Sequence, residues 1–249
     1  GFEVFSGGTQ RSTASASSTA NRQFSQDGEL LQVVFEVHKG GDKNNDLFLT
    51  EVMVRPIASG PEWIEIYNPT FMNVPLDEYR YNFCWNGCDS LEWEFSIPFD
   101  SGVVLLPNET YLLVHHNADS ILLSAANQTT NILSNGDDVV GLFHTPFNTI
   151  VDIIGVLDSA DNISSWAVDG VIDATKDHTM IRKPDVCGGN IGDWSLSDGS
   201  NGSSQWIVGV IDDFSDLNTH TSNCINSTAV EVLETLKGEL VEVRDVIGR

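Results

Sequence analysis

Two extended segments with alternating side chains constrain the fold of this chain more than any other feature. Residues 47–52 read Leu-Phe-Leu-Thr-Glu-Val, and residues 62–70 read Glu-Trp-Ile-Glu-Ile-Tyr-Asn-Pro-Thr. Pro56, Gly60 and Pro61 lie between them, and such residues interrupt regular structure. Alternation with a period of two predicts β-strands, so the pair predicts the opening strands of a β-sandwich.

Further short extended segments follow this pair and continue to about residue 218. Turn residues separate them at short intervals, a spacing typical of all-β proteins and not of α/β proteins. The segments predict three strand-turn-strand units: Tyr79–Cys84 with Glu92–Ile97, Val103–Leu106 with Thr110–His115, and Asp138–Phe143 with Thr149–Ile154. The sequence therefore predicts an all-β sandwich domain over residues 47–222.

The tryptophans indicate where the core of this domain lies. Burying one indole removes about 150 to 250 Å² from water, and at about 25 cal/mol per Å² this stabilises a fold by several kcal/mol at most. We expect Trp63, Trp166 and Trp194 to anchor the core. Trp85 lies in a short loop between two cysteines, and we expect it to be exposed.

The charge balance excludes one class of partner. The chain has 36 acidic and 12 basic residues, and its formal net charge is -24. Nucleic-acid binding depends on Lys and Arg that displace counterions, so we expect no nucleic-acid partner. Solubility in a saline or calcium-containing medium would also explain the acidic excess without a specific ligand. No apolar run approaches the roughly 18 residues of a membrane span, so we expect none.

The two ends of the chain differ from the predicted sandwich. Residues 1–46 contain a Ser/Thr-rich run, too polar to form a core of its own, and one strand pattern over Glu29–His38. Residues 223–249 have apolar residues at spacings of three and four and also an alternating pattern, so helix and strand both stay open. Each end could lie along its own domain or contact another chain. The start at Gly1 suggests a processed product or a segment of a longer polypeptide.

Four cysteines, Cys84, Cys88, Cys187 and Cys224, form an even set. Turn residues between the first two favour a disulfide there, and the second pair would tie a late loop to the C-terminal region. A zinc site made by all four is the rival interpretation, but zinc ribbons use two close C-x2-C pairs, and this chain has one close pair, spaced C-x3-C. We therefore predict two disulfides, which form in oxidising compartments.

Asn-x-Ser/Thr sequons add to the case for an extracellular compartment. Such sites accept N-linked glycans in secreted proteins. The candidate glycosylation sites are Asn108, Asn127, Asn162, Asn201 and Asn226. Together with the predicted disulfides, they favour a secreted or cell-surface glycoprotein.

A short polar run and a histidine pair are candidate metal ligands. Asp42, Asn44 and Asp46 place oxygen ligands at the first, third and fifth positions of a calcium loop, although its turn glycine and bidentate glutamate are missing. Solvated turn carboxylates are the alternative. His115 and His116 are adjacent, and adjacent strand residues point to opposite faces. We expect one to face inward and the other outward, so that they share no metal.

Glu51 and Glu65 interrupt otherwise apolar and aromatic strand segments. We expect both carboxylates to face solvent, and a partly buried ion pair with Arg182 or Arg55 is the alternative. The sequence contains no Gly-x-Ser-x-Gly elbow, phosphate-binding loop or His-Glu-x-x-His motif. We therefore expect no catalytic residues and no enzyme activity.

Several motifs of the predicted sandwich resemble the lamin tail domain, in the form found in extracellular proteins. The match covers roughly residues 47–221. Its motifs are LFLTEV and EWIEIYNPT, Val74–Asp77, Tyr111–His115, Ser134–Leu142, Val151–Gly155, Trp166, Thr179–Lys183, Trp194 or Trp206, and Phe214, Leu217 and His220. The resemblance implies an immunoglobulin-like β-sandwich. It implies no catalysis, because such domains act as attachment or interaction modules, for instance beside the catalytic domain of secreted nucleases.

These observations lead to three functional hypotheses. The first is a non-catalytic extracellular structural or adhesive protein, whose terminal segments join copies of itself or a neighbouring extracellular protein into a filament or surface assembly. The second is a substrate- or surface-attachment module of a larger secreted enzyme of the nuclease type. The third is a calcium-dependent domain for glycan binding or cell adhesion, with calcium as its cofactor.

Overall fold

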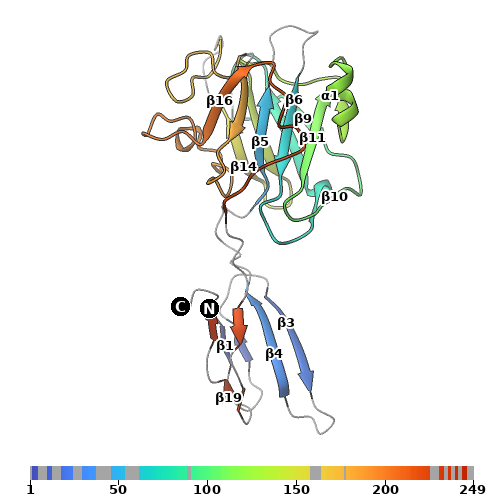
Figure 1. The fold of residues 1–249 in the computed structure, drawn as a ribbon, viewed down its shortest axis with the longest axis vertical. Coiled ribbons are helices and arrows are strands. Elements are labelled where there is room, and N and C mark those ends of the chain that lie inside the picture. Colours follow the sequence, from blue (N-terminus) through green and yellow to red (C-terminus); the bar gives the residue numbers. More distant parts are fainter. Residues whose placement is uncertain are drawn as a thin grey trace. The chain divides into compact units, whose positions relative to one another are not determined.

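A computed structural model divides the chain into two units, which are described separately (Figure 1). One unit comprises residues 43–224, and the other combines residues 1–42 with residues 225–249. The structure describes residues 2–4, 10–12, 18–24, 30–37, 46–53, 62–88, 91–157, 164–176, 178–224, 230–232, 235–236, 239–240 and 243–245. Side chains are described within residues 46–224 alone.

The unit of residues 43–224 contains two main sheets. The larger one has six strands in the order β12-β11-β6-β5-β15-β16. All neighbours in it are antiparallel except β11 and β12, which are parallel. Its strands are β5 (Phe48–Met53), β6 (Trp63–Tyr67), β11 (Thr110–His115), β12 (Gln128–Thr130), β15 (His178–Arg182) and β16 (Trp206–Ile211). The pairing of β5 with β6 confirms the opening strand pair predicted from the sequence.

The second sheet has four antiparallel strands in the order β14-β13-β8-β9. They are β8 (Tyr79–Cys84), β9 (Phe95–Pro98), β13 (Val139–His144) and β14 (Thr149–Ile154). A short ladder pairs β7 (Val74–Pro75) with β10 (Val104–Leu105). The helical elements of this unit are η1 (Leu76–Glu78), α1 (Ser120–Ala125) and η2 (Trp194–Leu196).

The two sheets enclose one hydrophobic core. Side chains from both contribute to it, including Leu49 and Ile66 of the six-stranded sheet and Tyr81 and Leu142 of the four-stranded sheet. Trp166, Trp194 and Trp206 are also members. Since a strand alternates its side chains between two faces, the facing rows of two sheets can bury each other. The predicted all-β sandwich is therefore confirmed.

Trp63 anchors a different cluster from the other tryptophans. It is fully buried, but on the outer face of the six-stranded sheet, with Leu112, Val114, Ala118 and Leu122. The short helix α1 covers this cluster, and the Asp119 side chain caps the helix by accepting hydrogen bonds from the amides of Ile121 and Leu122. The central strands β6 and β11 of this sheet are thus buried on both faces, which the strand patterns alone did not predict.

One of the three predicted strand-turn-strand units is wrong. Strands β10 and β11 do not pair with each other, because β10 pairs with β7 and β11 pairs with β6. Asn108 adopts a positive φ of 62°, and the turn it forms with Pro107 carries the chain from the β7–β10 ladder to the six-stranded sheet. The units β8–β9 and β13–β14 do pair as predicted, although β9 begins at Phe95 and not at Glu92.

The second unit contains strands from both ends of the chain. Hairpins pair β1 (Phe2–Val4) with β2 (Gln10–Ser12), β3 (Ser18–Phe24) with β4 (Leu30–Val37), β17 (Val230–Val232) with β20 (Val243–Asp245), and β18 (Thr235–Leu236) with β19 (Glu239–Leu240). Strand β17 lies beside β4. The N-terminal Ser/Thr-rich region, expected to lack structure of its own, thus supplies a strand that pairs with β4. In the C-terminal segment, the described residues are strands and not helix.

Candidate functional site

The two sheets of the sandwich have four outer strands, and Gln128 joins two of them. Its Nε2 donates a hydrogen bond to the carbonyl oxygen of Pro98 in β9 (3.0 Å). Its Oε1 accepts from the Asp100 amide (3.0 Å) and from the Tyr111 hydroxyl (3.1 Å). Because Gln128 itself belongs to β12, this side chain links an outer strand of each sheet. We call this the closed side of the sandwich.

A loop covers the third outer strand, β14. Asn190 bonds the backbone of Ile153 twice, accepting from its amide (3.0 Å) and donating to its carbonyl oxygen (2.7 Å). The Ile191 amide donates to the carbonyl oxygen of Val151 (3.1 Å). Gly189 permits this approach, since a Cβ there would lie 2.1 Å from the Val151 oxygen. Side-chain and backbone groups of the loop thus satisfy this edge.

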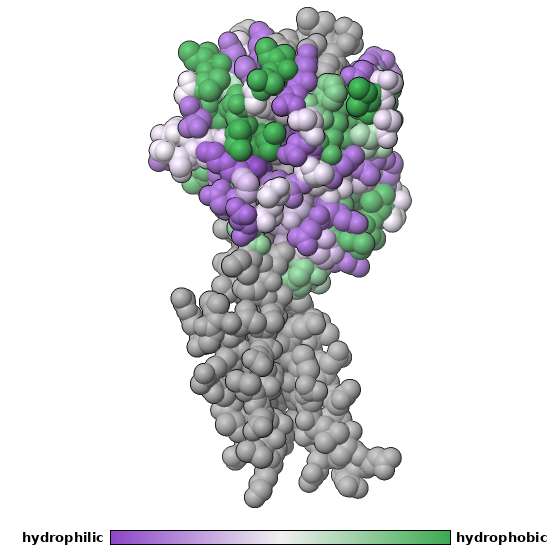
Figure 2. All heavy atoms as spheres, viewed as in Figure 1, coloured by the Kyte–Doolittle hydropathy of each residue, from purple (hydrophilic) through white to green (hydrophobic). Residues whose placement is uncertain are grey.

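Strand β16 ends the six-stranded sheet, and no strand or loop among the described residues pairs with its outer edge. Its sequence is WIVGVI, with no charged residue and no proline. Ile207, Val210 and Ile211 are 47%, 68% and 54% exposed. Figure 2 shows hydrophobic residues gathered in this part of the surface, among hydrophilic ones. Edge strands of natural proteins usually carry charges or proline, so this open, apolar edge is a candidate binding surface.

A side-chain contact closes the start of β16, and the pairing of the strand with β15 is irregular. The Ser204 hydroxyl accepts from the Trp206 amide (2.9 Å) and donates to the Trp206 carbonyl oxygen (3.2 Å). The register of β15 against β16 also shifts between His178 and Met180, which marks a β-bulge. The open stretch is therefore Ile207–Ile211.

The two ends of β16 carry opposite charges. Near the start of β16, the Lys183 amide donates to the carbonyl oxygen of Gln205 (2.9 Å). The Lys183 ammonium donates to the carbonyl oxygen of Ser204 (2.7 Å). At its end, Ile211 is followed by Asp212 and Asp213. The uncharged strand β16 thus has a cation near its first residue and carboxylates directly after its last residue.

A buried ion pair supports β16 from inside the sandwich. Arg182 of β15 donates to Asp152 of β14, and both side chains are fully buried. Asp152 also accepts from the amides of Leu49 and Asn190, at 3.0 Å each. The Arg182 guanidinium lies over the indole of Trp206, 4.0 Å from the ring centroid. Burial lowers the pKa of Arg182, and the charge of Asp152 opposes that shift.

Glu51 and Glu65, expected to face solvent, are buried, with exposures of 2% and 0%. They are direct cross-strand partners on the outer face of β5 and β6, and Arg182 pairs with Asp152 instead of either. Burial, then the charge of Glu65, raises the pKa of Glu51 to about 8. Burial raises the pKa of Glu65 to about 7 against hydrogen bonds from Thr50 (2.9 Å) and the Asn218 amide (2.6 Å). Burial and mutual repulsion thus favour a protonated carboxyl in this pair.

The segment that follows β16 covers these carboxylates. Phe214 packs edge-on against Trp63, with ring centroids 6.2 Å apart. Leu217 packs against the Trp63 cluster, and His220 lies 4.7 Å from the Tyr67 ring. Burial, then the charge of Arg182, lowers the pKa of His220 to about 4. The sequence missed this arrangement because the exposed or buried state of a strand glutamate depends on what covers that face.

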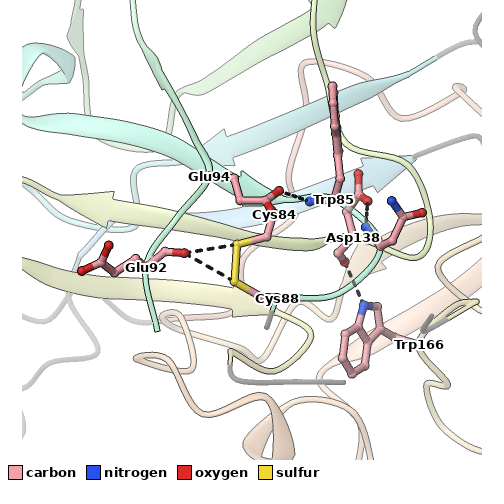
Figure 3. The surroundings of a disulfide bond; sticks show 8 residues. Cys84, Trp85, Cys88, Glu92, Glu94, Asp138 and Trp166 are labelled. Carbon is pink, nitrogen blue, oxygen red and sulfur yellow. Dashed lines mark hydrogen bonds between the residues drawn. A yellow bond between two sulfur atoms is a disulfide. The ribbon is translucent and has the colours of Figure 1, made fainter. Parts of the chain in front are cut away.

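The Cys84–Cys88 loop presents an exposed indole (Figure 3). Trp85 is 47% exposed, and its ring centroid lies 4.4 Å from that of Phe95. The Trp85 amide donates to Glu94 Oε2 (2.9 Å). Asp138 holds the other end of the loop by accepting from the Asn86 amide (2.8 Å). Burial raises the pKa of Asp138, although this bond and the Asn135 amide oppose the shift.

The cysteines pair as Cys84–Cys88 and Cys187–Cys224, with Cα atoms 5.3 Å and 5.5 Å apart. These are the pairs favoured by their sequence spacing. Three of the candidate glycosylation sites are exposed: Asn108, Asn127 and Asn201. The other two, Asn162 and Asn226, lie outside the described residues.

The candidate calcium ligands and the histidine pair give a mixed outcome. Asp42 and Asn44 lie outside the described residues. The Asp46 carboxylate bonds the Tyr79 hydroxyl and lies 3.4 Å from Nδ1 of His144. The rings of His115 and His116 lie side by side, 4.7 Å apart, so their expected opposite orientation is wrong. Strand β11 ends at His115, and the alternation of strand side chains does not extend to His116.

His144 is clamped between two carboxylates. Besides Asp46, its ring faces Glu78, with Nε2 3.5 Å from Oε2. The ring also stacks on Tyr79, with centroids 4.4 Å apart. Burial alone would lower the pKa of His144, but the hydrogen bonds and charges of Asp46 and Glu78 outweigh it and raise the pKa. This cluster ties the start of β5 to the four-stranded sheet.

Within the described ranges, no three His, Cys, Asp or Glu side chains are arranged to hold a metal ion. No helix in the same ranges has the length and hydropathy needed to cross a membrane. No family model, curated protein or solved structure matches the chain. The resemblance to the lamin tail domain therefore stays a prediction.

Proposed function

We propose that this chain is a non-catalytic extracellular structural or adhesive protein, a β-sandwich subunit of a filament or surface assembly. The open edge of β16 is the observation that carries the proposal. Backbone groups that no segment among the described residues pairs with, together with three exposed aliphatic side chains, offer another chain a place to add a strand. By contrast, the strongly perturbed carboxylates Glu51 and Glu65 are buried inside packing contacts, out of reach of a substrate.

The covalent features support an extracellular site of action. Two disulfides close the Cys84–Cys88 loop and tie Cys224 to Cys187 at the end of the sandwich. Disulfides persist in oxidising compartments, and exposed sequons such as Asn201 are accessible to glycosylation. The high negative charge keeps such a protein soluble until a specific contact forms.

The unit built from both chain ends supports a role in joining. Its strands come from residues 1–42 and 225–249. A subunit with a sandwich and a second β unit has two places at which contacts can form. Contacts between different surfaces propagate into open assemblies unless they close into a ring.

The full-length chain with its disulfides intact tests this proposal. We expect sedimentation velocity to show species larger than a monomer that grow with protein concentration, and electron microscopy to show what they form. The variant Ile121→Lys, changed at an exposed position of α1 towards the other end of the six-stranded sheet, should behave like the wild type. A single monomeric boundary at every concentration, in a protein that circular dichroism shows to be folded, would contradict the proposal.

A further inference from the structure

The open edge of β16 is the surface of the sandwich at which we expect another chain to bind. The closed side shares Gln128 between its two outer strands, and residues 189–191 cover β14. Among the outer strands of the described sandwich, β16 is the one whose uncovered stretch, Ile207–Ile211, carries exposed large aliphatic side chains. Exposed aliphatic side chains of this density on an edge strand predict pairing with another strand.

The charges at the ends of β16 select the direction of that pairing. Lys183 stands at its start, and Asp212 and Asp213 stand at its end. If two copies pair antiparallel about a two-fold axis near the middle of the strand, Lys183 of each copy lies beside the carboxylates of the other. Parallel pairing would instead bring like charges together, which costs free energy.

We infer that β16 pairs with β16 of a second copy of this chain, antiparallel about a two-fold axis, so that one continuous sheet runs through both sandwiches. The interface is isologous, since the same strand serves both copies. This inference rests on the proposed function, because it names one of the contacts through which copies join. Repulsion between two strongly acidic chains opposes the contact, so it strengthens as salt screens that repulsion.

Lysine substitutions in the open stretch test the contact. In sedimentation equilibrium of the full-length chain, Val210→Lys and Ile207→Lys should each raise the dimer dissociation constant at least about tenfold, because each places a charged side chain in the apolar contact between the two strands. Ile121→Lys is the matched control, since Ile121 is 59% exposed on α1, which packs on β11 towards the other end of the six-stranded sheet, and the dissociation constant of this variant should stay unchanged. Thermal melts identify any variant that fails to fold. In that case, the dissociation constant of the other lysine variant decides the test.

A charge exchange tests the two-fold geometry. Lys183→Glu and Asp212→Lys should each weaken the dimer at low salt, because each replaces two attractive contacts with two repulsive ones. The double variant should restore part of the dimerisation, since it returns opposite charges to positions 183 and 212 while Asp213 stays acidic. If either residue served only the folding of its own chain, the second substitution would not restore dimerisation.

The outcomes separate the inference from the function on which it rests. If the wild type associates and the lysine variants associate equally well, β16 is not the contact, and the assembly proposal stands. If the lysine variants are monomeric but the charge exchange gives no rescue and the wild type grows beyond dimers, β16 receives a different strand and the two-fold inference is overturned. If the wild type is monomeric throughout, both are overturned.

Discussion

On one side of the sandwich the outer strands β12 and β9 share the Gln128 side chain, whereas on the other side β16 ends its sheet without a neighbour among the described residues. The two sides belong to the same fold and bury the same core. The difference shows that stability does not require every edge to be closed, since the open side is held from within by Arg182 and Asp152. An edge that the fold does not need for stability is available for binding.

The largest expected effect concerns the internal support of the open side. Arg182→Leu leaves the Asp152 carboxylate buried without its cation, so we expect the free energy of unfolding to fall by about 3 to 5 kcal/mol. Urea denaturation at neutral pH measures this loss. Adding Asp152→Asn should recover part of it. A loss below about 1 kcal/mol would mean that the pair does not hold this side together.

A smaller effect concerns the cover that follows β16. Folding raises the pKa of Glu51 from 4.5 to about 8, so the folded chain binds this proton more tightly than the unfolded chain. The resulting stability is complete below pH 4.5 and is lost as the pH rises through about 8. We therefore expect Glu51→Gln to be more stable than the wild type at pH 9 by roughly 2 to 4 kcal/mol, and nearly equal to it at pH 5.

Glu109→Gln is the control for this pH dependence. Glu109 is exposed and accepts a hydrogen bond from the Leu106 amide, which a glutamine oxygen can also accept. Urea denaturation of both variants at the two pH values gives the comparison. If the stability of Glu51→Gln keeps the full pH dependence of the wild type, Glu51 is ionised in the folded protein. That result would contradict a raised pKa for Glu51.

The smallest effect concerns the closed side. Gln128→Ala removes one side chain with three hydrogen bonds, but Asp100 and Pro98 stay exposed to water. We expect a loss of about 1 to 2 kcal/mol, since water replaces part of what is lost. Asn73→Ala, at an exposed position, should change the melting temperature little. An equally small effect for Gln128→Ala would show that the closed side does not depend on this bridge.

Local sequence patterns were enough to predict the all-β class, the opening strand pair and two of the three strand-turn-strand units. These features depend on alternation and turn residues within a few positions, so they are readable along the chain. The pairing of β10 with β7 and of β11 with β6, on either side of Pro107 and Asn108, was not predictable. A turn residue does not show whether the two strands that it connects pair with each other.

The candidate binding surface shows the same limit. The apolar pattern of residues 206–211 is visible in the sequence, but its position at the outer edge of a sheet follows only from the pairing of distant segments. Glu51 and Glu65 were misplaced for a related reason. Their burial depends on residues 214–220, more than 140 positions away, and on the turn that brings this segment back over β5 and β6.

Hydrogen exchange of the full-length wild type at low and high protein concentration tests the central claim most directly. If β16 is the joining edge, amides within residues 207–211 should gain protection as the concentration rises, whereas amides of β9, β12 and β14 should not. Protection that rises on the closed side, or association that leaves residues 207–211 unchanged, would contradict the account.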